Sequence, residues 1–277
     1  MASPSYRQAV RRYFRNYVFA PRYRAEEVWS ARTSDGVRLA GARLAGPPDA
    51  FATVVLVHGF VHSARTPGIH AFARALSRQA EVIVPELRGH GGSAGECTLG
   101  REEPRDVEAA VAFAREARPG VPVVTVGVSL GGASALLHAG TYGGVAGVVA
   151  ISSPAWWGAW DTPATRRLRR YAMTTAGRVV AARLLGTRVA ARCEGVPDAR
   201  DIAAAISPAF GLIVHDPADH YFGEEHPRTL YEWLREPKAL WLEEGAGHGT
   251  DLLTPPFTAR LLAELRRSVV TGGGSVG

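Results

Sequence analysis

The residue in this sequence best placed to do chemistry is a serine in a glycine-flanked turn. Ser129 is the third residue of a match to the pattern G-x-S-x-G, in Gly127-Val128-Ser129-Leu130-Gly131. Residues 121–126 before it are rich in β-branched side chains and predict a buried strand, and residues 133–139 after it predict a helix. A tight turn between a strand and a helix exposes the serine hydroxyl above the sheet. Ser129 is therefore the predicted nucleophile.

A serine hydroxyl attacks well only when a neighbouring base removes its proton. That base is usually a histidine held in one tautomer by a carboxylate. Two histidines follow predicted strands: His215 ends the run 210–215, and His248 lies in a glycine-rich loop after the run 239–242. The flexible loop would allow His248 to reach Ser129, so we predict His248 as the base. The carboxylate should come from the loop after residue 215, as either Asp216 or Asp219.

The elements that must position these side chains alternate along the chain. Extended runs at 26–33 and 37–44 flank an Asp-Gly turn and predict a hairpin. Apolar strand patterns then alternate with helical ones, which predicts an α/β fold with a mostly parallel sheet covered by helices on both faces. The alternation stops between residues 155 and 208, where we expect a helical insertion that includes a helix over 166–185. The predicted divisions are a basic N-terminal helix (1–24), a core (25–154 and 209–268), the insertion (155–208) and a disordered tail (269–277).

Five segments in this order resemble the α/β-hydrolase superfamily, and the resemblance spans roughly residues 26–267. The segments are His58-Gly59-Phe60, Leu87 to Ser93, Gly127 to Gly132, Leu212 to Asp219 and Gly247-His248-Gly249. The resemblance implies the triad Ser129, Asp219 and His248. It favours Asp219 over Asp216 as the acid, although Asp216 stands where the family usually has a glycine.

The resemblance also implies the parts around the triad. The backbone N–H groups of Leu130 and Phe60 would form the oxyanion hole. The insertion at 155–208 would form a lid, with Trp156, Trp157 and Trp160 as pocket wall or, alternatively, as packing between lid and core. His58, Arg88 and His90 would shape loops and take no part in catalysis.

These features predict a serine hydrolase that cleaves an ester or related acyl bond of a small-molecule substrate through an acyl-enzyme. Ester, thioester, amide and carbon–carbon cleavage all start from the same triad and stay open. The alternatives are an acyltransferase or thioesterase acting on a carrier-bound acyl group, and a non-catalytic binding protein with the same fold. We expect no cofactor. A metal site at His215, Asp216, Asp219 and His220 is a further alternative, and we do not favour it because no second ligand pair accompanies it.

The charge and composition narrow the class of partner. The net charge of +6 is concentrated in six arginines within residues 1–24 and in a surplus of nine arginines over four acids at 155–208. No nucleic-acid motif accompanies them, so we expect no nucleic-acid binding. The N-terminal helix should dock on the domain edge rather than on a membrane surface. The lid arginines are either a solvated face or an attraction for anionic substrates. Two cysteines and no signal-peptide pattern predict a cytoplasmic protein.

Overall fold

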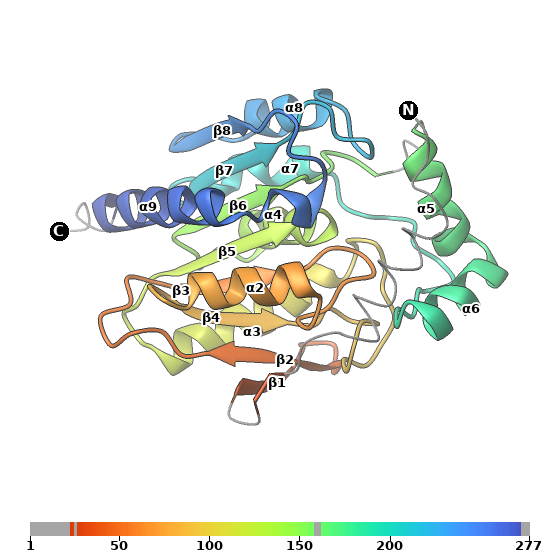
Figure 1. Ribbon diagram of the computed structural model, residues 1–277, viewed down its shortest axis with the longest axis horizontal. Helices are drawn as coiled ribbons and strands as arrows, with labels where there is room; N and C mark the ends of the chain where they lie inside the picture. The colour runs from red at the N-terminus through yellow and green to blue at the C-terminus, as the bar shows by residue number, and fades with distance from the viewer. Residues whose placement is uncertain (1–22, 25–26, 158–161, 273–277) are drawn as a thin grey trace.

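A computed structural model describes residues 23–24, 27–157 and 162–272 of the chain (Figure 1). The predicted N-terminal helix and Trp160 lie outside these residues. Among the described helices, none is long and apolar enough to cross a membrane.

Eight strands form one sheet in the order β1-β2-β4-β3-β5-β6-β7-β8. Their bounds are β1 Val28–Arg32, β2 Arg38–Leu44, β3 Thr53–Val57, β4 Glu81–Pro85, β5 Val123–Val128, β6 Gly147–Ile151, β7 Phe210–His215 and β8 Lys238–Leu242. The hairpin β1–β2 and the pair β2–β4 are antiparallel, and the pairs from β4 to β8 are parallel. The predicted N-terminal hairpin and mostly parallel sheet are both confirmed.

The central strands are buried along their whole length, which explains their composition. Every residue of β3, β5, β6 and β7 is buried. A strand with helices on both faces has no solvated side, so it reads as a continuous apolar run rather than an alternating one. The edge strand β1 buries only Trp29 and leaves Val28 two-thirds exposed.

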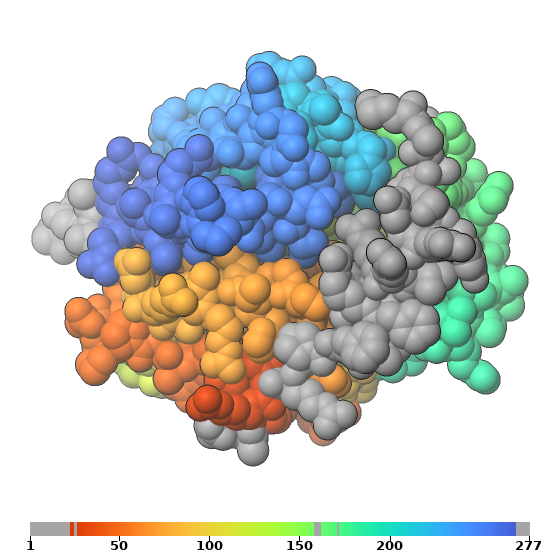
Figure 2. All heavy atoms as spheres, in the orientation of Figure 1, coloured from red at the N-terminus to blue at the C-terminus, as the bar shows by residue number. Residues whose placement is uncertain are grey.

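Helices cover both faces of the sheet (Figure 1). On one face lie α2 Pro67–Leu76 and α9 Pro255–Gly272, which contribute Phe72 and Phe257 to a shared core cluster. Figure 2 shows these two helices side by side on the surface. The other face carries α3 Glu103–Ala117, α4 Leu130–Thr141, α7 Ala199–Ala203 and α8 Glu225–Trp233.

The segment between β6 and β7 differs from the prediction in two ways. The helix expected over 166–185 is two helices, α5 Pro163–Met173 and α6 Thr175–Leu184. Thr174 breaks it in an extended conformation, where its hydroxyl donates to the Arg170 carbonyl and accepts from the Gly177 N–H. The second difference is α7, which buries Ala199 and Ala203 in the core cluster with α4 and α8. The predicted insertion therefore ends with residues that belong to the core.

The C-terminal boundary is also corrected. Helix α9 runs to Gly272, beyond the tail boundary predicted at residue 269. Val269 lies one helical turn after Leu265 on the same buried stripe and is only 4% exposed. Continued burial of that stripe explains why the helix does not stop at 268.

Candidate active site

Ser129 occupies the sharp turn between β5 and α4, with φ of 55° and ψ of −116°. Such a positive φ is rare for a residue with a Cβ, and the surrounding backbone holds it there. A Cβ at Gly127 would lie 2.2 Å from the Gly131 carbonyl oxygen, and one at Gly131 would lie 2.3 Å from that of Val57. The two glycines are therefore required by the close approach of β3, β5 and α4.

His248 lies between Ser129 and Asp219. Its Nε2 is 3.1 Å from the Ser129 Oγ, and its Nδ1 is 2.6 Å from the Asp219 Oδ2. The Asp219 side chain is fully buried, whereas that of His248 keeps 14% of its surface exposed. Three residues separated by 119 and 29 positions in the sequence thus form one chain of hydrogen bonds.

The loop after β7 fixes the orientation of Asp219. The other carboxylate oxygen, Oδ1, accepts from the backbone N–H groups of Tyr221 at 2.7 Å and Phe222 at 3.4 Å. His215 supports this loop from below, since its Nε2–H donates to the Phe222 carbonyl at 2.9 Å. Burial lowers the pKa of His215, which favours its neutral form. His215 therefore positions the acid loop and does not contact Ser129.

Asp216, the alternative acid, contacts backbone instead. Its carboxylate accepts from the N–H groups of Gly247 at 2.6 Å, Ala218 at 2.9 Å and Gly245 at 3.3 Å. Burial alone would raise the pKa of Asp216, but these three donors outweigh it and lower the pKa below its usual value. Asp216 thus anchors the loop that carries His248, a role that the sequence did not indicate.

A second anchor for the same loop comes from Ser152. Its hydroxyl accepts from the Gly249 N–H at 3.0 Å. Ser152 is buried at the end of β6, with a φ of 51°. No motif marked it, although its position at the carboxyl end of a central strand was a usable signal.

Two buried histidines shape the loop after β3, which contains Phe60. His58 accepts from the Leu87 N–H through Nε2 and donates from Nδ1 to the Gly59 carbonyl. His90 accepts from the Val61 N–H at 3.3 Å and donates to the Arg88 carbonyl. Burial lowers the pKa of His58 to about 4 and that of His90 well below its usual value, so both rings are neutral. Both histidines act as loop-shaping residues.

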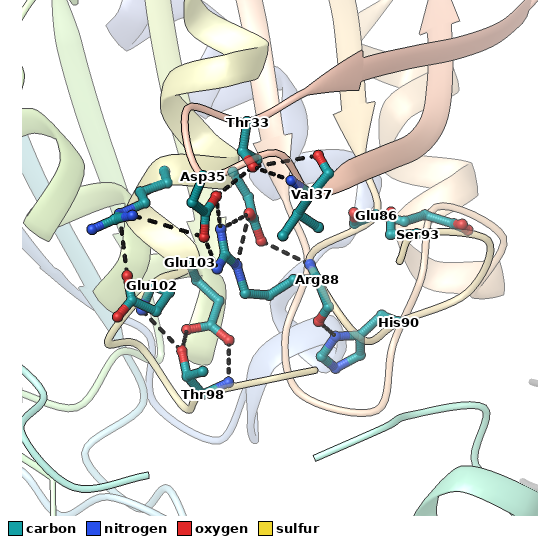
Figure 3. A network of polar contacts seen from close by, with 12 residues as sticks. Thr33, Asp35, Val37, Glu86, Arg88, His90, Ser93, Thr98, Glu102 and Glu103 are labelled. Carbon is teal, nitrogen blue, oxygen red and sulfur yellow. Dashed lines mark hydrogen bonds and ion pairs between the residues drawn. The ribbon is translucent and has the colours of Figure 1, made fainter. Parts of the chain in front are cut away.

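Arg88 anchors the next loop, as Figure 3 shows. Its guanidinium pairs with the buried carboxylate of Asp106 at 2.8 Å and with Asp35 of the hairpin turn at 2.8 Å. Farther along, Glu103 accepts from the N–H groups of Thr98 at 2.6 Å and Gly100 at 2.8 Å. These contacts tie residues 88–100 to the hairpin and to α3.

This anchored loop also holds the far end of the segment between β6 and β7. The Arg188 N–H donates to the Gly89 carbonyl at 2.8 Å, and the Cys97 N–H donates to the Arg188 carbonyl at 2.7 Å. The Ala190 N–H then donates to the Cys97 carbonyl at 2.9 Å. Residues 188–190 are therefore attached to the core by backbone hydrogen bonds on both sides of the loop.

A cavity of about 380 Å³ opens beside Ser129 and His248. Phe60 and Leu130 border it on the core side. The residues of α5 that border it are Ala164, Arg167 and Leu168. Of the predicted pocket tryptophans, Trp157 borders the cavity. Trp156 is not among the residues that border it: its ring centroid lies 4.2 Å from that of His226 and it packs against the core cluster of α4, α7 and α8, as in the alternative of packing between lid and core.

The acid loop does not form a metal centre in the part of the chain that the structure describes. There, no three His, Cys, Asp or Glu side chains are grouped to hold an ion. His215 and Asp219 are committed to the contacts given above.

Comparison with known proteins identifies the family of the chain and solved structures with a similar fold. The profile of the alpha/beta hydrolase family matches residues 54–275. No curated protein sequence matches the chain.

Solved structures resemble the chain in fold. The Pyrococcus furiosus esterase Pf2001 is 18% identical, with 90% of this chain and 96% of that one covered and a TM-score of 0.70. The alpha/beta hydrolase GrgF from a Penicillium species is also 18% identical, covering 88% and 98%, with a TM-score of 0.69. The esterase RhEst1 from a Rhodococcus species is 20% identical, covering 91% and 100%, with a TM-score of 0.61. With the profile match over most of its length, the chain belongs to the alpha/beta hydrolase family.

Proposed function

We propose that the protein is a serine hydrolase that cleaves carboxylic esters of small molecules through an acyl-enzyme. The observation that carries the proposal is the hydrogen-bond chain from Ser129 through His248 to the buried Asp219. That chain supplies a nucleophile, a base and a carboxylate that orients the base. The esterases with the same fold support the choice of ester as the bond.

In the proposed first half-reaction, His248 Nε2 takes the proton from Ser129 as the serine Oγ attacks the substrate carbonyl carbon. The carbonyl oxygen becomes an oxyanion, which we assign to the backbone N–H groups of Leu130 and Phe60. His248 then gives its proton to the alcohol oxygen, and the carbon–oxygen bond breaks. The acyl group stays on Ser129, and the alcohol leaves.

In the second half-reaction, His248 takes a proton from water, which attacks the acyl-enzyme at the same carbonyl carbon. Collapse of the second tetrahedral intermediate releases the carboxylic acid, and the proton returns to Ser129. Asp219 remains ionised throughout and stabilises the imidazolium of His248. The partner is thus a small-molecule acyl substrate, and no cofactor takes part in these steps.

We further propose that residues 155–190 act as the lid, with α5 over the cavity. The support is that Ala164, Arg167 and Leu168 of α5 border the same cavity as Ser129. A cover of this kind excludes water and selects the substrate. We propose a cytoplasmic location because Cys97 and Cys193 are both buried as free thiols, which is typical of a reducing compartment.

A fluorophosphonate probe tests the proposal directly, because it forms a covalent adduct only with an activated serine. Mass spectrometry of the labelled protein should find one adduct, on the peptide that contains Ser129. Hydrolysis of p-nitrophenyl butyrate should stop in the labelled protein. Absence of labelling together with absence of ester hydrolysis would leave the non-catalytic alternative in place.

A further inference from the structure

The cavity beside Ser129 is mostly apolar, and a single permanently charged cation borders it among the residues that the structure describes. Its apolar wall includes Phe60, Leu99, Val128, Trp157, Leu168 and Leu185. The cation is Arg167, on the first turns of α5. A cavity of this size suits a small substrate held largely by apolar contacts, with a few polar groups that fix its orientation. Arg167 is the strongest of those polar groups.

Among the described residues, the guanidinium of Arg167 has no hydrogen-bond or ion-pair partner. Its neighbour Arg166 does have a partner. Arg169 is exposed and likewise has no partner in the described part of the chain, but it does not border the cavity. Residues two apart on a helix point in different directions, which separates Arg169 from Arg167. Arg167 is thus an uncommitted cation at the cavity.

The acid at the cavity does not neutralise Arg167. Asp251 borders the cavity beside His248, but it already has an interaction of its own, and no ion pair joins it to Arg167. Among the described residues that border the cavity, the other polar side chains include those of His62, His220, Tyr221 and Thr250, and none of these is a carboxylate. The five donors of a guanidinium match the geometry of a carboxylate or phosphate. The cavity therefore offers a site for an anion facing Ser129.

We propose that Arg167 binds an anionic group of the substrate, so that the preferred substrate is an ester that also carries a carboxylate or phosphate. The inference rests on the proposed ester hydrolysis and adds a substrate class to it. The anion can sit on the acyl part or on the alcohol part of the ester, and the test distinguishes the two.

Two matched pairs of esters provide the test. On the acyl side, the mono-p-nitrophenyl ester of glutaric acid is compared with the same ester bearing a primary amide in place of the free carboxylate. On the alcohol side, the butyrate ester of 4-hydroxybenzoate is compared with that of 4-hydroxybenzamide. Each pair differs in charge and hardly in size. The quantity measured is the ratio of kcat/KM for the anionic ester to that for its neutral partner.

The unmodified protein should favour the anionic member of one pair, and Arg167→Gln should lower that ratio by about tenfold or more, since charge-assisted hydrogen bonds are lost. Arg167→Lys should restore part of the ratio. Arg169→Gln is the matched control on the same helix and should leave the ratio unchanged. Added salt should reduce the preference, because the site is open to solvent.

The outcomes separate this inference from the proposed function. If the ratio in both pairs is the same in the unmodified protein and in Arg167→Gln, the anion site is wrong while ester hydrolysis stands. An equal effect of Arg169→Gln would also overturn the anion site, because the preference would then come from the summed positive charge of the arginines on α5 and not from a contact with Arg167. If the unmodified protein hydrolyses none of the four esters above the rate of Ser129→Ala, the proposed function itself fails.

Discussion

The hydroxyl of Ser152 is hydrogen-bonded to the backbone N–H of Gly249 at 3.0 Å. This contact ties the end of β6 to the residue that follows His248, across 97 positions in the sequence. Asp216 ties down the residue before His248 through the Gly247 N–H at 2.6 Å. The histidine is therefore held from both sides by neighbouring strand ends, although it lies in a loop with three glycines.

Ser152→Ala should lower kcat by about tenfold, because loss of this hydrogen bond loosens His248 relative to Ser129 and small misplacements are costly. KM should change little, since Ser152 does not border the cavity. Steady-state kinetics on p-nitrophenyl butyrate measure both. Ser153→Ala is the control, because the Ser153 hydroxyl bonds to the adjacent Pro154 carbonyl instead. Equal effects of the two substitutions would argue against a positioning role for Ser152.

Ser129→Ala should reduce kcat for ester hydrolysis on the order of 10⁴-fold or more, as deletion of a nucleophile does in other triads. The thermal midpoint should stay nearly constant, because alanine keeps the Cβ and meets the same backbone constraints at φ of 55°. Calorimetry measures the thermal midpoint, and an ester assay measures kcat. Substantial turnover in a folded Ser129→Ala protein would refute the nucleophile.

Asp219→Asn should lower kcat by roughly 10³-fold to 10⁴-fold, because an amide holds His248 in the wrong tautomer and cannot stabilise the imidazolium. Asp216→Asn should lower it far less. Its carboxylate accepts only backbone N–H groups, and an asparagine oxygen can retain part of that set. The comparison is made on kcat with one ester. A larger loss for Asp216→Asn would reverse the assignment of the acid.

The stability of the protein should fall as the pH drops from about 6.5 to about 4. In the unfolded chain His58 and His90 take up protons near pH 6.5, whereas burial keeps them neutral in the folded state down to pH 4 or lower. The unfolded state therefore binds more protons in this window, which costs roughly 1.4 kcal/mol per pH unit for each histidine. Thermal unfolding at a series of pH values measures the slope.

His90→Gln should make that slope shallower, because glutamine does not titrate and can still accept from the Val61 N–H. Burial, and to a lesser degree the neighbouring rings of His58 and His62 and the charge of Arg188, hold the pKa of His90 well below its usual value, so its contribution should persist toward the low end of the pH series. An unchanged slope in His90→Gln would show that other groups control the acid side of the stability curve.

The strands and the serine turn could be predicted from the sequence because their signals are local. β7 has the predicted bounds, 210–215, because a run of apolar residues buried on both faces gives a strong local signal. For the partner of His248, the residues alone left Asp216 and Asp219 open, and the family resemblance favoured Asp219, which lies 2.6 Å from His248. The residues that hold His248 in place were harder to predict, because Ser152 and Asp216 act through backbone N–H groups distant in sequence. The position of Ser152 at a strand end was a signal for a site residue but did not identify its partner.

The insertion was predicted less well, also for physical reasons. The break at Thr174 depends on one hydroxyl bonding in both directions within an otherwise helical composition. Trp156 and Trp157 are adjacent and chemically identical, yet one packs on His226 and the other borders the cavity. The local path of the backbone decides which of the two rings packs on the core and which borders the cavity. Amino-acid composition does not predict that path.

The backbone attachment of residues 188–190 divides the segment between β6 and β7 into two independent loops. The first follows Ser152 and ends at Thr187; it contains α5 and α6 and is closed at both ends by the core. Changing the length of a flexible loop alters the free energy of folding by only about 0.6 kcal/mol per doubling. Because α5 and α6 bury Ala172 and Ala181 in a core cluster, this low cost applies to changes that keep those two contacts. Insertions, deletions or exchanges within it would change the wall above Ser129 while leaving the anchors of His248 untouched. In evolution or in protein engineering, substrate range can therefore vary along this stretch without new compensation in the rest of the chain.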